Sequence, residues 1–174
     1  MLERLWNGWR AAYVAGAAAA DVASDAPLVG GSVFTQILAS GLSDDEAHIV
    51  FRGECCFAIM NAFPYTSGHL MVLPYREVAE LEDLTTDEAA DLWATVTDAV
   101  RVLKAVYRPG GLNVGVNLGR PAGGSVSQHL HVHVVPRWAG DANFMTAVAD
   151  TRTLPEALAD SAAKVRAAWI ALQR

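Results

Sequence analysis

Three histidines at alternate positions are the residues of this sequence best suited to chemistry. His129, His131 and His133 are each separated by one residue. On an extended strand, this spacing directs all three imidazoles to one face, with successive backbone positions about 6.6 Å apart and the outer two about 13 Å apart. The residues between them are apolar and would face the core: Leu130, Val132 and Val134. The pattern predicts a half-buried strand with a reactive histidine face.

Only His131 has a histidine on both sides. A neutral imidazole is a competent nucleophile toward phosphorus near pH 7. Its neighbours can donate hydrogen bonds to phosphate oxygens or to a departing oxygen. A metal site and a merely polar strand face are the alternatives, although three histidines at this spread do not share one ion on a flat strand. The spacing therefore favours a nucleophile.

A glycine-rich loop directly precedes the histidines. Residues 117–125 are NLGRPAGGS, so that Gly123, Gly124 and Ser125 follow Asn117 closely. The two glycines allow backbone N–H groups to converge on an anion, and the serine hydroxyl adds a hydrogen bond or a proton. A Gly-Gly-Ser segment alone is most often a turn. In front of three aligned histidines, it predicts a phosphate-binding loop.

Two apolar runs upstream predict a pair of antiparallel strands. Residues 55–61 and 69–73 have strand composition, and Pro64, Ser67 and Gly68 supply a turn between them. Alternating polar and apolar residues predict two further strands, over 112–118 and 129–135. In the first of these, Val114, Val116 and Leu118 are expected on the buried face.

Two helices complete the prediction. Thr85 and Glu88 have the spacing of a capping box, which places a long helix over residues 85–107. Its expected buried stripe is Leu92, Val96, Ala99, Leu103 and Val106. A second helix is expected after residues 153–155, with the stripe Leu158, Ala162, Val165, Trp169 and Leu172. The pattern predicts an α+β fold with an antiparallel sheet rather than alternating βαβ units.

Composition narrows the class of protein. The 174 residues include 13 Lys and Arg against 19 Asp and Glu, a net charge of −6, which argues against a nucleic-acid partner bound through a broad basic face. No run of 18 apolar residues occurs, so no membrane-spanning helix is expected. The two cysteines, Cys55 and Cys56, are adjacent and cannot close a loop, which indicates a reducing compartment and a cytoplasmic location.

The first 31 residues differ from the rest of the sequence. Trp6, Trp9 and Tyr13 form an aromatic arm, and residues 14–31 are rich in Ala, Gly and Asp without periodicity. We therefore expect an N-terminal arm and linker over residues 1–31 and a catalytic domain over residues 32–174. The arm is expected to dock on a neighbouring subunit.

The segment from His129 to Trp138, HLHVHVVPRW, resembles the signature of the histidine triad (HIT) superfamily of nucleotide hydrolases and transferases. Residues 61–74 and 113–119 are similar to further segments of that family, and the resemblance extends from about Phe34 to Phe144. It implies a HIT-like fold with an antiparallel sheet of about five strands, one long helix and one C-terminal helix.

Within this superfamily, the sequence is most similar to the actinobacterial diadenosine tetraphosphate phosphorylases. The similar segments are residues 5–13, 64–72, 74–76, 80–84, 123–125 and 136–144. The resemblance implies attack by His131 on a nucleotide α-phosphate, a covalent nucleotidyl-histidine, and its cleavage by inorganic phosphate. The alternative is a hydrolase of dinucleoside polyphosphates or nucleoside phosphoramidates with the same nucleophile. A binding protein without turnover is a third possibility, against which the intact triad argues.

The resemblance also implies roles for the surrounding residues. His129 and His133 would flank the phosphate and assist the leaving oxygen, while Asn117, Gly124 and Ser125 would bind phosphate. The remaining implied positions are Asn61 at the ribose hydroxyls, Trp138 along the substrate path, and His69 supporting the site from behind. From the residues alone, His69 could equally be a buried structural histidine.

Two departures from the family pattern matter. Many bacterial members hold zinc through a Cys-x-x-Cys pair and a later histidine, and the aligned positions are Ser32, Thr35 and Glu77. We therefore expect no structural zinc and no cofactor. The Gln that ordinary hydrolases of the family carry before the triad is also missing, which favours the phosphorylase branch. The expected partners are a dinucleoside polyphosphate, inorganic phosphate, and copies of the same chain in a homodimer or larger homo-oligomer.

Overall fold

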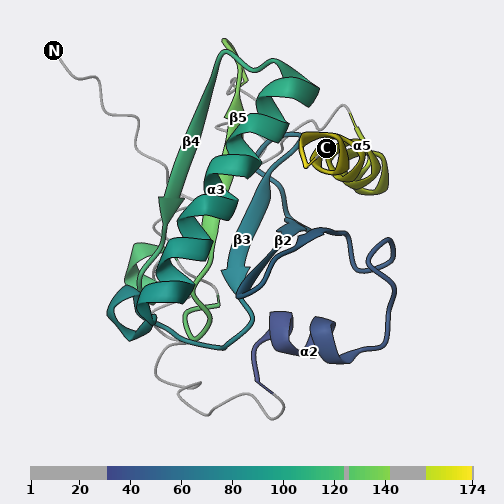
Figure 1. Ribbon diagram of the computed structural model, residues 1–174. Coiled ribbons are helices and arrows are strands. Elements are labelled where there is room, and N and C mark those ends of the chain that lie inside the picture. Colours follow the sequence, from purple (N-terminus) through teal and green to yellow (C-terminus); the bar gives the residue numbers. More distant parts are fainter. Residues whose placement is uncertain (1–30, 124–125, 142–155, 174) are drawn as a thin grey trace, which may run out of the picture.

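The computed structural model describes residues 31–123, 126–141 and 156–173. Its centre is an antiparallel sheet with the strand order β1-β2-β3-β5-β4 (Figure 1). The strands are β1 (Ile49–Arg52), β2 (Cys56–Met60), β3 (Leu70–Pro74), β4 (Gly111–Val116) and β5 (Val132–Arg137). The α-helices are α2 (Val33–Ala39), α3 (Thr86–Tyr107) and α5 (Leu158–Leu172), and short 3-10 turns cover Leu81–Asp83 and Arg120–Ala122. This architecture confirms the predicted α+β class and the antiparallel sheet.

The central hairpin agrees with its prediction. Strands β2 and β3 pair antiparallel in continuous register from Cys56 opposite Pro74 to Met60 opposite Leu70. Every residue of both strands is buried, because helices cover one face of this pair and a second apolar cluster covers the other. The sequence predictions include no strand over residues 49–52, where β1 pairs with β2 across an irregular register.

The sheet has two differently covered faces. Helices α3 and α5 pack side by side against one face and bury the larger core with it (Figure 1). On the other face, Phe34 of α2 packs in a smaller cluster with Phe57, Ile59 and Met71. Val132 and Val134 of β5 belong to the helix-covered core. The side chain of His133 therefore lies on the opposite face, because neighbouring residues of a strand alternate.

Helix α3 begins and ends for reasons that the sequence contains. The Thr85 side chain accepts a hydrogen bond from the Glu88 backbone, and the Glu88 side chain reaches back to the Thr85 backbone, so the predicted capping box is confirmed. The helix ends at Arg108, which adopts a left-handed conformation with φ of 45°. The predicted stripe is buried, except that Val106 is only partly buried, and Thr95 and Val102 extend it.

Two elements differ from the predictions at their exposed ends. Val114 is 42% exposed because β4 is the last strand of the sheet order, and Leu118, which lies beyond the end of β4, is 38% exposed. In α5, Ala162, Val165 and Trp169 are buried, but Leu172 in the last turn is 43% exposed. Ala157 precedes this helix, and the predicted start at residues 153–155 lies outside the described residues.

The observed start of β5 also differs from the predicted one. The prediction extended this strand from 129 to 135, whereas β5 covers Val132–Arg137. His129 and His131 therefore precede the strand. Instead of pairing as a strand residue, Leu130 donates its backbone N–H to the carbonyl of Val78 at 2.6 Å, and this bond holds the incoming segment.

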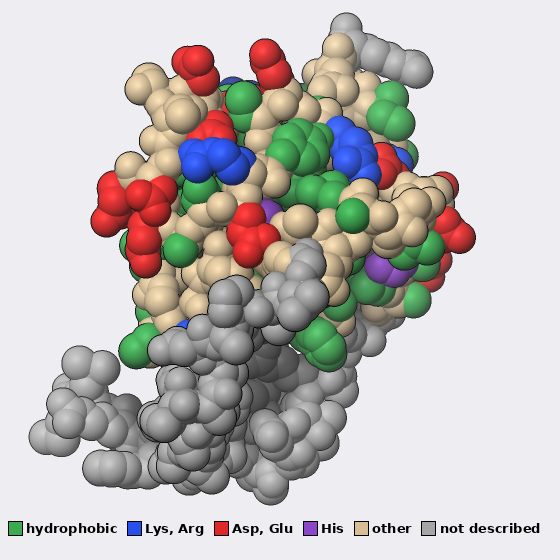
Figure 2. Space-filling model, turned by 90° about the horizontal axis from the view of Figure 1, so that it is seen from below, with side chains coloured by type: hydrophobic (Ala, Val, Ile, Leu, Met, Phe, Trp, Pro, Cys, Tyr) green, Lys and Arg blue, Asp and Glu red, His purple; other side chains and the backbone are tan. Residues whose placement is uncertain are grey.

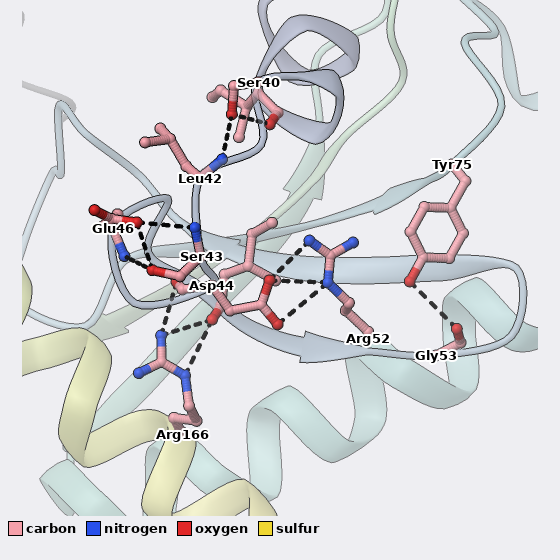
Figure 3. A network of polar contacts seen from close by, with 11 residues as sticks. Ser40, Leu42, Ser43, Asp44, Glu46, Arg52, Gly53, Tyr75 and Arg166 are labelled. Carbon is pink, nitrogen blue, oxygen red and sulfur yellow. Dashed lines mark hydrogen bonds and ion pairs between the residues drawn. The ribbon is translucent and has the colours of Figure 1, made fainter.

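Helix α5 is tied to the beginning of the sheet by Arg166 (Figure 3). Its guanidinium donates to the backbone carbonyls of Ile49 and Asp44 and forms an ion pair with Asp45. Trp169 of the same helix stacks on Phe51 of β1, with ring centroids 4.7 Å apart.

No helix among the described residues is long and apolar enough to cross a membrane. The predicted boundary between an arm over residues 1–31 and a domain over residues 32–174 stays a prediction, because residues 1–30 lie outside the described part of the chain.

Candidate active site

The candidate site lies on the sheet face opposite α3 and α5, where β5 lies between β3 and β4. His133 pairs across the sheet with Met71 on one side and Gly115 on the other. The centroid of its ring lies 4.8 Å from that of His131 and 5.1 Å from that of His69. A Cβ atom placed on Gly115 would meet nothing within 4 Å, so the space at this register of β4 is open. The structure therefore brings three of the predicted histidines together.

The hydrogen bonds of His131 define its tautomer. Its Nδ1 lies 2.8 Å from the backbone carbonyl oxygen of His129. A carbonyl oxygen only accepts, so Nδ1 carries the proton of the neutral ring and Nε2 keeps a lone pair. No described residue forms a hydrogen bond with Nε2. Burial lowers the pKa of His131 below its ordinary value, so the ring is neutral near pH 7. These are the properties of a nucleophilic nitrogen.

A second chain of hydrogen bonds defines the tautomer of His133. The backbone N–H of Tyr65 donates to Nδ1 of His69 at 3.1 Å, so the proton of a neutral His69 is on Nε2. That nitrogen lies 3.0 Å from Nδ1 of His133 and donates to it. The proton of His133 is consequently on Nε2. Burial, and secondly the neighbouring His131, lower the pKa of His133 to about 4, so it acts as a neutral hydrogen-bond donor.

Asn117 is the hydrogen-bond partner of the protonated Nε2 of His133. Its side-chain amide lies 3.4 Å from Nε2 of His133. Because Nε2 carries a proton in this tautomer, the amide orientation that suits the contact presents Oδ1 to the ring. Asn117 therefore holds the orientation of His133 from the end of β4.

His129 is in a different environment from the other two triad histidines. It is fully buried, and its Nε2 donates to the carbonyl of Pro74 at 2.9 Å while its Nδ1 lies 2.7 Å from Oγ of Ser32. Phe34 packs edge-on against its ring at 5.6 Å. Burial lowers the pKa of His129. Both of its ring nitrogens are thus engaged by the protein.

The three positions that align with zinc ligands of the family converge on His129. Oε2 of Glu77 accepts hydrogen bonds from the Ser32 backbone N–H at 2.8 Å and from the Thr35 hydroxyl at 2.7 Å. The Thr35 hydroxyl lies 3.1 Å from Oγ of Ser32. Of Ser32, Thr35, Glu77 and the adjoining His129, the first two end in hydroxyls, which are not zinc ligands in structural sites. These residues do not fit a zinc ion.

The described residues contain no group of three or more His, Cys, Asp or Glu side chains that could hold a metal ion. Cys55 and Cys56 are free thiols, and burial raises the pKa of Cys56 to about 12. The absence of a structural zinc and of a cofactor stays a prediction.

Asn61 lies over His69. Its amide nitrogen is 3.4 Å from both ring nitrogens, which places it above the ring rather than in line with either lone pair. Its Oδ1 accepts from the backbone N–H of Phe63 at 2.9 Å. The predicted ribose residue is therefore beside the histidines.

Trp138 lies beyond the end of β5, where its ring packs edge-on against Tyr107 at 6.2 Å. Gly123 has a φ of 101°, a conformation suited to glycine, and begins the predicted phosphate loop. Gly124 and Ser125 lie outside the described residues.

Tyr65 is a site residue to which the sequence reasoning gave no role. Its ring lies 4.6 Å from that of His69 and 6.0 Å from that of His133, and 46% of it is exposed. Phe34 was also missed, although it contacts both His129 and His131. Tyr65 belongs to the Pro-Tyr motif before Gly68-His69, which was the available signal.

Figure 2 shows one face of the molecule, on which acidic side chains are widespread and basic side chains lie in separate small groups. Histidine side chains are visible there at separate points and form no continuous patch. This face has no continuous basic surface among the described residues.

Comparisons with known proteins agree with this geometry. A family model described as the HIT domain matches residues 43–140. A Mycobacterium tuberculosis protein named AP-4-A phosphorylase is 48% identical over 169 residues, which cover 97% of this chain and 85% of that protein. The asymmetrical bis(5'-nucleosyl)-tetraphosphatase of Schizosaccharomyces pombe is 35% identical over 95 residues, 55% of this chain and 52% of that protein.

Among solved structures, a zinc-bound histidine triad family protein from Mycobacterium smegmatis superposes with a TM-score of 0.66. It is 28% identical in sequence, and the alignment covers 82% of this chain and 95% of that one.

Proposed function

Since the chain belongs to the HIT domain family, we propose that it is a nucleotidyl-transferring phosphorylase of dinucleoside polyphosphates. Its reaction converts diadenosine tetraphosphate and inorganic phosphate to ATP and ADP. The observation that carries the proposal is the tautomer of His131, whose Nδ1 is bound to the His129 carbonyl and whose Nε2 is the nucleophilic atom. The similarity to AP-4-A phosphorylase of Mycobacterium tuberculosis, along nearly the whole chain, supports this substrate and acceptor.

The first step is attack by Nε2 of His131 on the α-phosphorus of one adenosine. The new N–P bond forms as the bond from that phosphorus to the bridging oxygen breaks, and ATP leaves with the bond's electron pair. The ring becomes positively charged in the covalent adduct, and its Nδ1–H then makes a charge-assisted bond to the His129 carbonyl. In the second step an oxygen of inorganic phosphate attacks the same phosphorus, which restores neutral His131 and yields ADP.

The neighbouring residues supply positioning and hydrogen bonds. His133 donates its Nε2–H to a phosphate oxygen or to the departing oxygen, a role that suits a neutral ring held by His69 and Asn117. Gly124 and Ser125 contribute N–H and hydroxyl donors to the phosphates, and Asn61 binds the ribose hydroxyls. Trp138 lines the substrate path. In this reaction, the backbone carbonyl of His129 holds the Nδ1–H group of His131.

The second candidate function is hydrolysis, in which water replaces phosphate as the acceptor. The similarity to the tetraphosphatase of Schizosaccharomyces pombe favours hydrolysis over binding without turnover. Phosphorolysis and hydrolysis share the His131 adduct and differ only in the second step. The acceptor therefore decides between them.

The test is to incubate the full chain with diadenosine tetraphosphate, with and without inorganic phosphate, and to separate the products by anion exchange. We expect ATP and ADP, formed only when phosphate is present. ATP and AMP without phosphate would establish the hydrolase instead. Absence of turnover in both reactions would reject both activities on this substrate. Cleavage of a nucleoside phosphoramidate would then establish a hydrolase, and its absence, with dinucleotide binding retained, would favour a binding protein.

We also propose that the chain forms a homodimer or a larger homo-oligomer. Among the described residues, β4 pairs only with β5, so its outer edge is open and carries the exposed Val114. An open apolar edge strand is a template for pairing with a second copy. The aromatic arm of Trp6, Trp9 and Tyr13 would add to this contact, although it lies outside the described residues.

The chemistry of His131 needs no cofactor, and we propose that none is bound. The net charge of −6 argues against a nucleic-acid partner. The free thiols of Cys55 and Cys56 suit a reducing compartment, and we assign the protein to the cytoplasm.

A further inference from the structure

A chain of polar contacts behind the active site has no part in the proposed reaction steps. It extends from the Glu77 carboxylate through the hydroxyls of Thr35 and Ser32 to Nδ1 of His129. Ser32 and His129 are both fully buried. The contacts join residues far apart in sequence, since Ser32 and His129 are 97 positions apart. Which of these contacts are hydrogen bonds depends on where the two hydroxyl protons lie.

The protons can be counted along this chain. The Pro74 carbonyl accepts a hydrogen bond from the protonated Nε2 of His129, so in the neutral ring the Ser32 hydroxyl donates to Nδ1. The Thr35 hydroxyl donates to Glu77, whose pKa is lowered first by the hydrogen bond from the Ser32 backbone and which is therefore ionised at pH 7. With both hydroxyl protons assigned, none is left for the 3.1 Å contact between Thr35 and Ser32, and Ser32 Oγ accepts instead from the Thr35 backbone N–H at 3.2 Å. Among the described residues, Ser32 is therefore the side chain that gives His129 Nδ1 a hydrogen bond, and Thr35 acts on Ser32 through its own backbone and through Glu77, which holds the Ser32 backbone.

Residues 74–78, at and after the end of β3, hold the segment before β5 at two points and the start of α2 at a third. The Pro74 carbonyl holds the His129 ring, the Val78 carbonyl accepts the Leu130 backbone N–H at 2.6 Å, and Glu77 holds Ser32 and Thr35. The His129 carbonyl, which fixes the His131 tautomer, lies between the first two of these contacts along the chain. The His129 ring anchors one end of the planar peptide group that carries this carbonyl, and the Leu130 N–H anchors the other, so loss of the ring contacts would free one end of the group that holds the nucleophile.

We propose that Ser32, Thr35 and Glu77 are positioning residues, which hold the His129 ring and, through the His129 carbonyl, keep the His131 nucleophile in its reactive tautomer. The proposal rests on the proposed function only in taking His131 as the nucleophile. It gives a catalytic purpose to a cluster that aligns with zinc ligands elsewhere in the family, and hydrogen bonds take the place of the metal.

Gly31 shows how closely the cluster is packed. It has a φ of 81°, and a Cβ atom placed on it would lie 2.8 Å from Oε2 of Glu77. The turn that delivers Ser32 to His129 therefore requires glycine at this position.

The test compares substitutions that remove one contact each. Ser32→Ala removes the donor to His129, and Thr35→Val removes the next hydroxyl while keeping the branched shape. Thr35→Ser keeps that hydroxyl and is the conservative variant. Ser40→Ala is the matched control, since Ser40 caps the other end of α2 through hydrogen bonds to Ile37 and Leu42 (Figure 3).

Two readouts separate positioning from folding. The first is the single-turnover rate of His131 nucleotidylation with diadenosine tetraphosphate, measured with kcat and KM. We expect about a tenfold loss in rate for Ser32→Ala with KM within about twofold, as for other partners that orient catalytic groups. Thr35→Val should also lower the rate of His131 nucleotidylation, but by a smaller factor. Thr35→Ser and Ser40→Ala should stay within about twofold of the wild type.

The second readout is the ¹⁵N NMR spectrum of the histidine rings, which needs no substrate. We expect protonated Nδ1 for His131 in the wild type and a mixture of tautomers in Ser32→Ala. If Ser32→Ala does not fold, Thr35→Val provides the same comparison.

The outcomes are distinct. Wild-type rates and an unchanged His131 tautomer in both Ser32→Ala and Thr35→Val would overturn the proposal, as would an equal loss in Ser40→Ala. If the wild type does not turn over the dinucleotide but the His131 tautomer changes as expected, the proposed function fails and the positioning role stands.

Discussion

Substituting alanine for Gly68 should both destabilise the fold and disturb the active site. Gly68 has a φ of 79°, and a Cβ atom there would lie 2.5 Å from Cε2 of Tyr107. The left-handed conformation costs an alanine ~1–2 kcal/mol, and forcing extra volume into a packed site typically costs a further ~1–3 kcal/mol. We therefore expect Gly68→Ala to lower the free energy of unfolding by roughly 2–5 kcal/mol.

Gly41 supplies the control for this substitution. Its φ is 77°, but nothing lies within 4 Å of a Cβ atom placed on it. Gly41→Ala should therefore lower the free energy of unfolding only by the cost of the left-handed conformation, ~1–2 kcal/mol. In a Tyr107→Ala background, where the opposing ring is absent, Gly68→Ala should cost no more than Gly41→Ala does.

Urea unfolding followed by fluorescence measures these differences, with the slope m checked for constancy. Equal losses for Gly68→Ala and Gly41→Ala would refute the reasoning, because the Tyr107 contact would then have no energetic effect. Gly68 also precedes His69, whose Nε2 holds His133. The folded fraction of Gly68→Ala should therefore show a lower kcat.

Three further predictions concern the site and the assembly. His131→Ala should abolish turnover of diadenosine tetraphosphate and leave its affinity within about tenfold by calorimetry; residual turnover would reject His131 as the nucleophile. The pKa values of His131 and His133 are lowered in the folded state, so the unfolded chain binds more protons below pH 6.5 and stability should fall from there toward pH 4. Urea midpoints at pH 7, 5.5 and 4.5 check this, and a flat profile would contradict it. Val114→Lys should lower the mass measured by light scattering, since it places a charge at the open edge of β4; an unchanged mass would place the subunit interface elsewhere.

The elements whose signals are local could be predicted from the sequence. The capping box of Thr85 and Glu88 needs only two residues three positions apart, and it defined the start of α3 correctly. The hairpin of β2 and β3 was equally clear, because two apolar runs flank a turn. Strand β1 was missed because its four residues carry too short a pattern and its pairing is irregular.

The arrangement of the site depends on contacts that no local pattern contains. The alternation of His129, His131 and His133 predicted three imidazoles on one face of a single strand, but the strand begins only at Val132. His129 is held by Pro74 and Ser32, 55 and 97 positions away, and no local pattern contains these partners. Leu130 nevertheless lies in the helix-covered core with Val132 and Val134, as the alternation predicts. The tautomers of His131 and His133 likewise follow from particular carbonyl and N–H groups that only the folded chain brings together.

The hydrogen bonds between Arg166 of α5 and the start of the sheet can form only late in the synthesis of the chain. Arg166 of α5 lies beside Asp44 at the start of the sheet (Figure 3), and Ile49, whose carbonyl also accepts from Arg166, is 117 positions before it. Strands β1 and β2 leave the ribosome long before α5, at roughly 5–20 residues per second, so the side of these strands that α5 covers stays open in the nascent chain. Closure of this face is therefore a late, long-range event of high contact order, which slows folding. A fragment that ends before Leu158 lacks α5, so the same apolar face stays exposed. Such a fragment is expected to bind chaperones or be degraded rather than to fold into an active enzyme.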